Sequence, residues 1–506
     1  MMQPKPQQQT PPLDSIPSLR AVTITSEPAP VFGQRSLPES YRTSGPRRRG
    51  PVAVTARPLD FSNIDWALVY RIRLTVSQRL SDETGQQLAD SLIDEATRIQ
   101  IGRDMIAHIV KQHSDDAILA GDRLNQIAAV DLERYRRAVD CSIFGYGRWQ
   151  PLLEDPHVEN IEILGHDRVF MVYGDRIERV APVADSDAEL IEQLQFISAY
   201  SKTPKPFSEA HPEMTLNLED RFRLHAVGFA EIVDRPSIVI RQHTFAGVAL
   251  QELCSSGMMP TKVFEFLSAA VKAKQSIVIS GIGGAGKTTF LRALAMEMDP
   301  LESVGVVETD PELFLHKLPG RLRTVNFTAS DGSGEGVGPD GRPIGEFTVQ
   351  QHLMELLRQN ISRIIVGEVR GSEAATMFQA MQVGAGSLST IHAQHAAATI
   401  ERLVTAAALG GGMTQIDAYR QIAVNINLII HLGTEDRRTQ TQGGKLRRYV
   451  NQITEISGFR DSADGNGTTY MPATDLLYEA HTPGRPLDEK MSGQMREALY
   501  ANGWRP

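Results

Sequence analysis

The sequence predicts an α/β protein: a parallel-sheet domain built around one glycine-rich loop, a smaller α+β domain before it, and a disordered N-terminal tail. Three observations lead to this prediction. A β-branched run over Ser276–Ser280 enters the glycine-rich loop, and an apolar-periodic helix follows it. Buried strands alternate with helices after that loop, as in a parallel sheet. Before residue 245 the pattern is instead one of short strands and turns.

Length, charge and cysteine content restrict the class of protein. A chain of 506 residues is long for one core and predicts two or three domains. The net charge of −9 argues against a general nucleic-acid binder. Cys141 and Cys254 lie far apart, which fits a reducing compartment and no Cys-based zinc site. Without a membrane-length apolar run or a signal peptide, a soluble cytoplasmic protein is expected.

The N-terminal part divides into a tail and a helical region. Residues 1–56 are rich in Pro, Gln, Ser and Arg, which predicts disorder. Their Arg47–Arg49 cluster fits a solvated tail or a contact with acidic lipid or nucleic acid. Residues 57–145 form the helical region. Its helical pattern over residues 61–113 is punctuated by Gly85 and Gly102, and a second helix is expected over residues 123–143.

Residues 146–245 are predicted to form the α+β domain. Its helix is expected over residues 187–200. Its strands are expected at residues 160–164, 169–173, 176–180, 214–218, 221–228 and 237–241. This segment has no phosphate-binding signature of its own.

A linker over residues 246–260 leads to the parallel-sheet domain at residues 261–457. After the glycine-rich loop, the strands are expected at Val304–Glu308, Arg363–Gly367, Ser387–Ile391, Asn427–Leu432 and Tyr449–Ile456. Helices are expected at residues 261–272 and 348–358. The turn-forming residues 331–345 predict a mobile surface loop. Residues 458–506 are a C-terminal extension whose pattern predicts no particular structure.

The glycine-rich loop fits G-x-x-x-x-G-K-[ST] and has the strand and helix that this pattern requires. Its glycines let backbone N–H groups form a nest for phosphate oxygens at the positive end of the new helix. Lys287 is expected to reach the β/γ-phosphates, and the Thr288 hydroxyl to ligate Mg²⁺. The alternative is an ordinary turn. The expected nucleotide-binding residues are Gly281, Ile282, Gly283, Gly284, Ala285, Gly286, Lys287, Thr288 and Thr289.

Hydrolysis of a γ-phosphate also needs carboxylates and positive charge. Glu368 ends an apolar strand, where it could hold Mg²⁺ through water or act as base, or be an ordinary surface acid. Glu308 ends the strand after the loop helix and could orient the attacking water. Glu312, one turn further, fits a helix cap better. His392 could sense the γ-phosphate or be structural, and spacing alone leaves both open.

Together these residues resemble the type II/IV secretion-system ATPases, the hexameric motors of pilus assembly, protein secretion and conjugation. The resemblance spans roughly residues 148–455. Its motifs are a Walker A loop (281–288), an acidic box VVETDPEL (306–313), a Walker B segment RIIVGEVRG (363–371) and a histidine box GSLSTIHA (386–393). The last two, with the upstream PLLEDPHVENIEILGHDRVFMVYGDRIE, look most like the CpaF-type ATPases of tight-adherence pili, followed by the VirB-type conjugation ATPases.

The resemblance implies a RecA-like ATPase domain that uses ATP and Mg²⁺ and assembles as a homo-hexamer. It implies inner-membrane platform proteins as partners, a place at the inner face of the membrane, and no specific nucleic acid. Glu368 would be the Walker B carboxylate and a metal ligand, Glu308 the acidic-box carboxylate, and His392 the histidine-box residue. Arg223 and Arg241 would reach the nucleotide from the α+β domain.

The sequence also departs from the family pattern. Thr309 stands where an Asp is expected, so that role passes to Asp310 or is lost. Residues 383–385 hold no first histidine, and residues 359–362 lack the usual Arg-Pro-Asp. The four-cysteine insert of the general-secretion branch is missing, which argues against that branch. The rival hypotheses are a conjugation ATPase, a nucleic-acid motor, and a scaffold that binds ATP with little turnover.

Overall fold

The structure is a computed structural model of the whole chain. It describes residues 61, 64–87, 95–122, 126–199, 201, 204–218, 221–243, 247–318, 320–321, 323–332, 336–339, 341–382, 386–409, 413–438, 444–463, 468–482 and 486–506. The predicted disordered tail over residues 1–56, with Arg47–Arg49, lies outside these residues. Residues 383–385 lie outside them as well. In the part that is described, no helix has both the length and the apolar character needed to cross a membrane.

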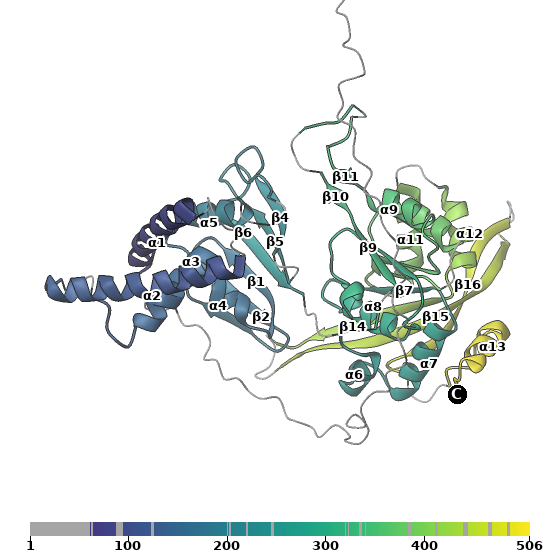
Figure 1. Cartoon of the computed structure of the whole chain (residues 1–506). Helices are drawn as coiled ribbons and strands as arrows, with labels where there is room; N and C mark the ends of the chain where they lie inside the picture. Colours follow the sequence, from purple (N-terminus) through teal and green to yellow (C-terminus); the bar gives the residue numbers. More distant parts are fainter. Residues whose placement is uncertain are drawn as a thin grey trace, which may run out of the picture. The chain divides into compact units, whose positions relative to one another are not determined.

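Three helices form the first part of the described chain, at the purple and blue end of Figure 1. They are α1 (Trp66–Gln87), α2 (Glu95–Leu119) and α3 (Leu132–Phe144). Two sequence predictions are corrected here. Gly85 and Gly102 lie inside α1 and α2 and end neither helix. A Cβ at Gly102 would lie 2.4 Å from the Phe144 ring, so this glycine permits close packing of α2 on α3. The later helix begins at Leu132, not near residue 123.

The α+β segment folds into a six-stranded antiparallel sheet in the order β3-β2-β1-β6-β5-β4. Its elements are η2 (Gly147–Trp149), α4 (Gln150–Glu154), β1 (Val158–Leu164), β2 (Val169–Tyr173), β3 (Ile177–Val180), α5 (Asp187–Ala199), β4 (Glu213–Leu218), β5 (Phe222–Val227) and β6 (Ser237–Gln242). The expected strands and the helix are confirmed. One face of the sheet packs on α5, with Leu190 and Leu194 in the same core as Ile161 and Ile240. On β5 and β6, Arg223 and Arg241 pair directly across the strands.

The second sheet has eight strands in the order β16-β15-β14-β7-β13-β12-β8-β9. They are β7 (Ile277–Gly281), β8 (Val304–Glu308), β9 (Thr324–Thr328), β12 (Arg363–Val369), β13 (Leu388–His392), β14 (Leu428–Asp436), β15 (Leu446–Ala463) and β16 (Thr468–Glu479). The strands from β14 to β9 are parallel, whereas β15 and β16 are antiparallel. All the strands predicted for this domain are present. β12 is two residues longer than expected, so Glu368 lies within the strand.

Helices cover both faces of this sheet, as a parallel sheet requires. One layer contains α7 (Thr261–Lys272), α8 (Lys287–Met296) and α13 (Gly493–Ala501). The other layer contains α9 (Val349–Leu356), α10 (Glu373–Met381), α11 (Ala398–Ala408) and α12 (Gln415–Asn425). Alternate residues of β7 point into opposite layers: Ile277 and Ile279 join the first core, and Val278 the second. Four short elements complete the domain, namely α6 (Leu250–Ser255), η3 (Leu315–Lys317) and the paired strands β10 (Ser330–Asp331) and β11 (Glu346–Phe347).

The described residues of the C-terminal extension contribute to this domain's core, although their sequence predicted no particular structure; the core residues are Leu477, Leu487, Met491, Met495, Leu499 and Trp504. β15 runs through the expected boundary near residue 457, and β16 returns beside it. Trp504 then packs edge-on against Phe266 of α7 at a ring separation of 5.7 Å. Trp504 therefore packs on the helical layer that contains α7, which precedes the glycine-rich loop, and α8, which follows it.

Candidate functional site

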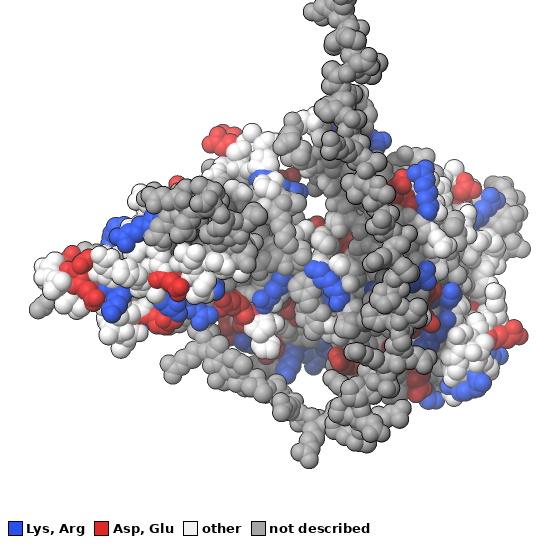
Figure 2. All heavy atoms as spheres, viewed as in Figure 1, with Lys and Arg blue, Asp and Glu red and all other residues white. Residues whose placement is uncertain are grey.

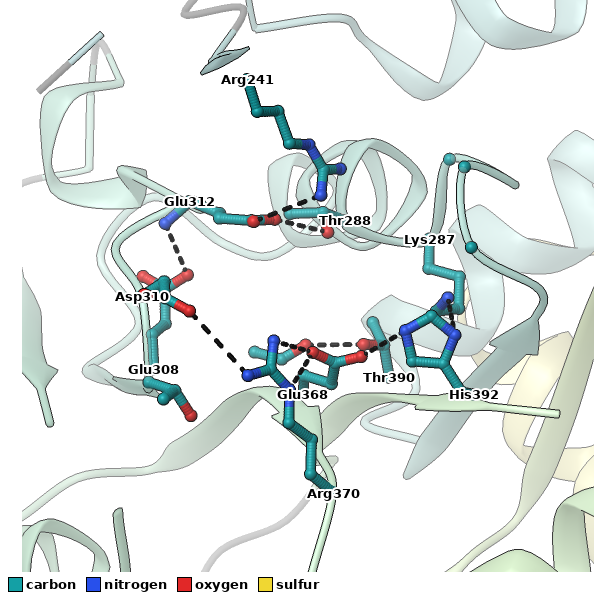
Figure 3. Close-up of a pocket in the computed structure, with 15 residues that line it drawn as sticks. Arg241, Lys287, Thr288, Glu308, Asp310, Glu312, Glu368, Arg370, Thr390 and His392 are labelled. Atoms are coloured by element: carbon teal, nitrogen blue, oxygen red, sulfur yellow. Dashed lines mark hydrogen bonds and ion pairs between the residues drawn. The ribbon is translucent and has the colours of Figure 1, made fainter. Parts of the chain in front are cut away.

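One cavity lies where β7, β8, β12 and β13 end (Figure 3). Because these strands are parallel, their carboxyl ends meet at one edge of the sheet, where ligands of such folds bind. The cavity is lined by Arg241, Gly283, Gly284, Gly286, Lys287, Thr288, Glu308, Thr309, Asp310, Glu312, Gly367, Glu368, Arg370, Thr390 and His392. Four separated segments thus bring the predicted acids, lysine and histidine to one place.

The loop backbone needs its glycines. Gly284 and Gly286 have φ angles of 74° and 85°, in the left-handed region that disfavours other residues. A Cβ at Gly281 would lie 2.8 Å from the carbonyl oxygen of Leu432 on the neighbouring β14. The helix α8 begins directly at Lys287, so its first N–H groups open toward the cavity. Loops with this geometry, placed before a helix, form anion-binding nests in other proteins.

Lys287 is held inside the loop. Only 7% of the residue is exposed, and Nζ donates to the carbonyl oxygens of Gly281 (3.2 Å) and Ile282 (3.0 Å). Nζ also lies 3.2 Å from Nδ1 of His392. Burial lowers the pKa of Lys287 to about 8. A triphosphate at this place would supply the negative charge that the buried ammonium lacks.

Glu308 is the most deeply buried acid of the site, with 3% exposed. Its Oε1 accepts from the backbone N–H groups of Glu312 (3.0 Å) and Leu313 (2.9 Å), whereas its Oε2 is buried without a hydrogen-bond partner. Burial raises the pKa of Glu308 to about 8. Gly367 makes room for it, because a Cβ there would lie 2.9 Å from Cγ of Glu308. A carboxyl with one unpartnered oxygen and a pKa near neutrality suits proton exchange with water.

Glu368 lies in the middle of a chain of charged groups (Figure 3). Its Oε1 is 2.7 Å from Nε2 of His392, and its Oε2 accepts from the Arg370 guanidinium. Burial, and then the charge of Lys287, lower the pKa of His392. His392 therefore bridges the loop lysine and the β12 acid. It is not an isolated core histidine.

The arginines of the antiparallel sheet meet the acids that follow β8. Arg223 pairs with Asp310 at 2.8 Å, and Arg241 lies 3.5 Å from Glu312. Two arginines directly opposite each other in a sheet repel, so these acids offset that repulsion. Glu312 also accepts from the Thr288 hydroxyl at 3.0 Å. Its expected role as a helix cap is wrong, because residues 309–314 contain no helix start beside it.

Nine of the fourteen predicted site residues line this cavity, and five do not. Gly281 and Ala285 belong to the glycine-rich loop but do not line the cavity. Arg223 does not line the cavity but reaches it through Asp310. Thr289 lines the adjoining groove, and Ile282 leaves 45% of its side chain exposed outside it. Arg370 was not singled out from the sequence. The spacing could have indicated it. Arg370 lies two residues after Glu368, and on an extended chain residues two apart point to the same side.

A family model described as "Type II/IV secretion system protein" matches residues 212–456. Among curated proteins, the chain is 27% identical over 348 residues to "Uncharacterized protein MJ0900" of Methanocaldococcus jannaschii, covering 68% of this chain and 58% of that protein. It is 25% identical over 330 residues to "Putative conjugal transfer protein Rv3659c" of Mycobacterium tuberculosis, covering 63% and 90%. The match therefore spans less than two thirds of the archaeal relative.

Among solved structures, the chain is similar to the VirB11 ATPase from the Brucella suis type IV secretion system, crystallised with sulphate. The identity is 22%, the match covers 60% of this chain and 92% of that one, and the TM-score is 0.30.

Proposed function

The chain belongs to the type II/IV secretion ATPase family, and we propose that it hydrolyses ATP with Mg²⁺ at this cavity. The observation that supports this most is the convergence of Lys287, Glu308, Glu368 and His392 on one phosphate-loop cavity. Phosphoryl transfer to water needs positioning and charge stabilisation more than covalent chemistry. The cavity offers both.

The loop would hold the β- and γ-phosphates. Its backbone N–H groups and the N-terminus of α8 face the anion, and Lys287 adds a direct charge. The base and ribose would then extend into the adjoining groove, which shares Gly284 and Gly286 with the cavity and continues past Thr289 to Met258. Arg241 lines both spaces, so it is placed to meet the phosphates.

The residues around Thr288 fit Mg²⁺. The Thr288 hydroxyl contacts the Glu312 carboxylate, the Glu368 carboxylate lines the same cavity, and hard cations prefer such oxygen ligands. When bound, Mg²⁺ would neutralise charge on the β- and γ-phosphates. Glu308 would orient the attacking water and, in the ionised form that predominates above about pH 8, take its proton at Oε2. Glu368 would help to hold Mg²⁺, and His392 would link Glu368 to Lys287 beside the γ-phosphate.

We further propose that the chain works as a homo-hexamer at the inner face of the cell membrane, with platform proteins of a pilus or secretion system as partners. The Walker B and histidine-box segments favour a CpaF-type role in pilus assembly. A conjugation ATPase is the second candidate, because one curated relative is named as a putative conjugal transfer protein. Identifying the membrane protein that co-purifies with the full chain separates the two.

A nucleic-acid motor is the rival that a simple assay addresses. On the face shown in Figure 2, acidic and basic side chains are interspersed over the described surface. Nucleic-acid motors instead present a basic groove with stacking aromatics. Stimulation of turnover by single-stranded DNA, falling steeply with salt, would favour the rival.

The proposed function is tested with two variants. Lys287→Ala removes the phosphate-loop charge and should abolish hydrolysis, whereas Glu368→Gln should retain ATP on the protein without turnover. Both are measured as phosphate release and as nucleotide bound after gel filtration. Turnover by Lys287→Ala at the wild-type rate would overturn the assignment of the site.

A further inference from the structure

We infer that Arg448 is a positioning residue that ties the phosphate loop to the first strand of the antiparallel sheet. The inference rests on the proposed function, because it takes the loop as the site of ATP. Arg448 lies on β15, where it pairs with Thr434 of β14. Its Nε donates to the carbonyl oxygen of Gly284 at 2.8 Å, and its two terminal nitrogens form a fork with Glu159 at 3.2 and 2.8 Å. One guanidinium thus joins two parts of the chain.

The bond to Gly284 sets the orientation of a peptide in the loop. A trans peptide is planar, so its C=O and N–H point in opposite directions. With the Gly284 carbonyl drawn outward to Arg448, the Ala285 N–H points back across the loop, where it meets the Ile282 carbonyl oxygen at 3.3 Å. That long hydrogen bond is weak, and a phosphate oxygen can replace it. The stem of Arg448 also packs at Gly286, where a Cβ would lie 3.4 Å from Cδ.

The partner acid lies beside the arginine that lines the cavity. Glu159 precedes Asn160 on β1, and Asn160 pairs with Arg241 on β6. The two neighbouring strands therefore make two contacts with the nucleotide site: Arg241 through Glu312, and Glu159 through Arg448. Any rotation of this sheet would move both contacts together.

The strand that carries Arg448 is itself fixed against the antiparallel sheet. Leu446 N–H donates to the Gly174 carbonyl oxygen at 3.1 Å, and Arg438 donates to that of Tyr173 at 2.8 Å. In Figure 1 the β14–β15 pair runs from the large sheet toward β2, in agreement with these bonds. Arg448 therefore lies on a hydrogen-bonded strand pair that is anchored at the β2–β3 turn and reaches the phosphate loop.

The first test compares Arg448→Ala with Arg447→Ala. Arg447 lines the same groove and carries the same charge, but its guanidinium lies over Tyr449. Binding of a fluorescent ATP analogue with Mg²⁺ should weaken about tenfold in Arg448→Ala, as expected for a lost charged hydrogen bond, and stay within about twofold in Arg447→Ala. Arg448→Lys keeps one donor and should recover part of the loss. Equal losses in both alanine variants would mean that any positive charge in the groove has the same effect. That result would overturn the inference.

The second test uses the sign of the effect of Glu159→Ala. Removing a negative charge near a triphosphate should tighten binding by electrostatics alone. If Glu159 holds Arg448 on the loop, binding should instead weaken about threefold to tenfold. The double variant should bind no worse than Arg448→Ala, because both changes break the same link. Tighter binding by Glu159→Ala, or fully additive losses, would overturn the inference.

Different results would contradict the proposed function and the role of Arg448. If the wild-type chain binds no ATP analogue, the proposed function is wrong. If wild type binds, Lys287→Ala does not, and Arg448→Ala binds like wild type, only the role of Arg448 is wrong. Thermal unfolding of each variant checks that the fold is retained.

Discussion

Replacing Glu308 by Gln should stabilise the protein while it removes catalysis. Glu308 is 3% exposed and one of its oxygens has no hydrogen-bond partner, so the ionised form is poorly solvated. Gln keeps the shape, and its Oε1 can still accept from the N–H groups of Glu312 and Leu313. The substitution therefore removes the cost of a buried charge and keeps the backbone contacts.

The magnitude follows from the pKa. The pKa of Glu308 is raised from 4.5 to about 8, which corresponds to about 5 kcal/mol at full ionisation. Between these pH values the folded protein keeps a proton that the unfolded chain loses. The free energy of unfolding of the wild type should thus fall as pH rises from about 4.5 to 8. Relative to wild type, Glu308→Gln should gain about 1.4 kcal/mol of stability per pH unit through this window.

The assay is urea unfolding of the full chain at pH 5, 6, 7 and 8, for wild type, Glu308→Gln and the surface control Glu355→Gln. Glu355 is exposed on α9 and outside the cavity, so its variant controls for the loss of one surface carboxylate. Phosphate release by Glu308→Gln should fall at least about a hundredfold. A stability difference between Glu308→Gln and wild type that stays flat from pH 5 to 8 would refute the reasoning.

Three further predictions follow from single contacts. Gly367→Ala places a Cβ 2.9 Å from Cγ of Glu308, so kcat should drop about tenfold or more with little change in ATP affinity. Because the pKa of Lys287 is lowered to about 8, ATP affinity measured by calorimetry should weaken above pH 8, toward about tenfold per pH unit, and a flat profile to pH 9.5 would count against that role. Gly102→Ala forces a Cβ to 2.4 Å from the Phe144 ring, which should destabilise α2 and α3 by about 1 to 3 kcal/mol, measured by hydrogen exchange, and unchanged protection there would contradict the packing argument.

Local signals predicted the large sheet well. Short β-branched runs identified β7, β8 and β12, because strands buried on both faces are mostly apolar. The parallel-sheet rule then predicted that Lys287, Glu308 and Glu368 meet at one edge, and they line one cavity. Their catalytic roles remain predictions.

Contacts between distant segments could not be predicted in this way. Arg448 and Glu159 are 289 residues apart. Glu159 lies in the upstream segment that carries the family resemblance, but nothing in that pattern indicates Arg448 as its partner. Glycine was misinterpreted in the helical region, because Gly102 serves a close helix contact that only the fold reveals. β16 and α13 were missed, because the sequence beyond Gly458 lacks the continuous apolar runs of the central strands.

The most direct measurement of the central claim is steady-state release of phosphate from MgATP by the purified full chain, compared with Lys287→Ala. The wild type should show saturable turnover that requires Mg²⁺ and is absent in the variant. Equal release by the two proteins, or none by a folded wild type that also fails to bind ATP, would contradict it.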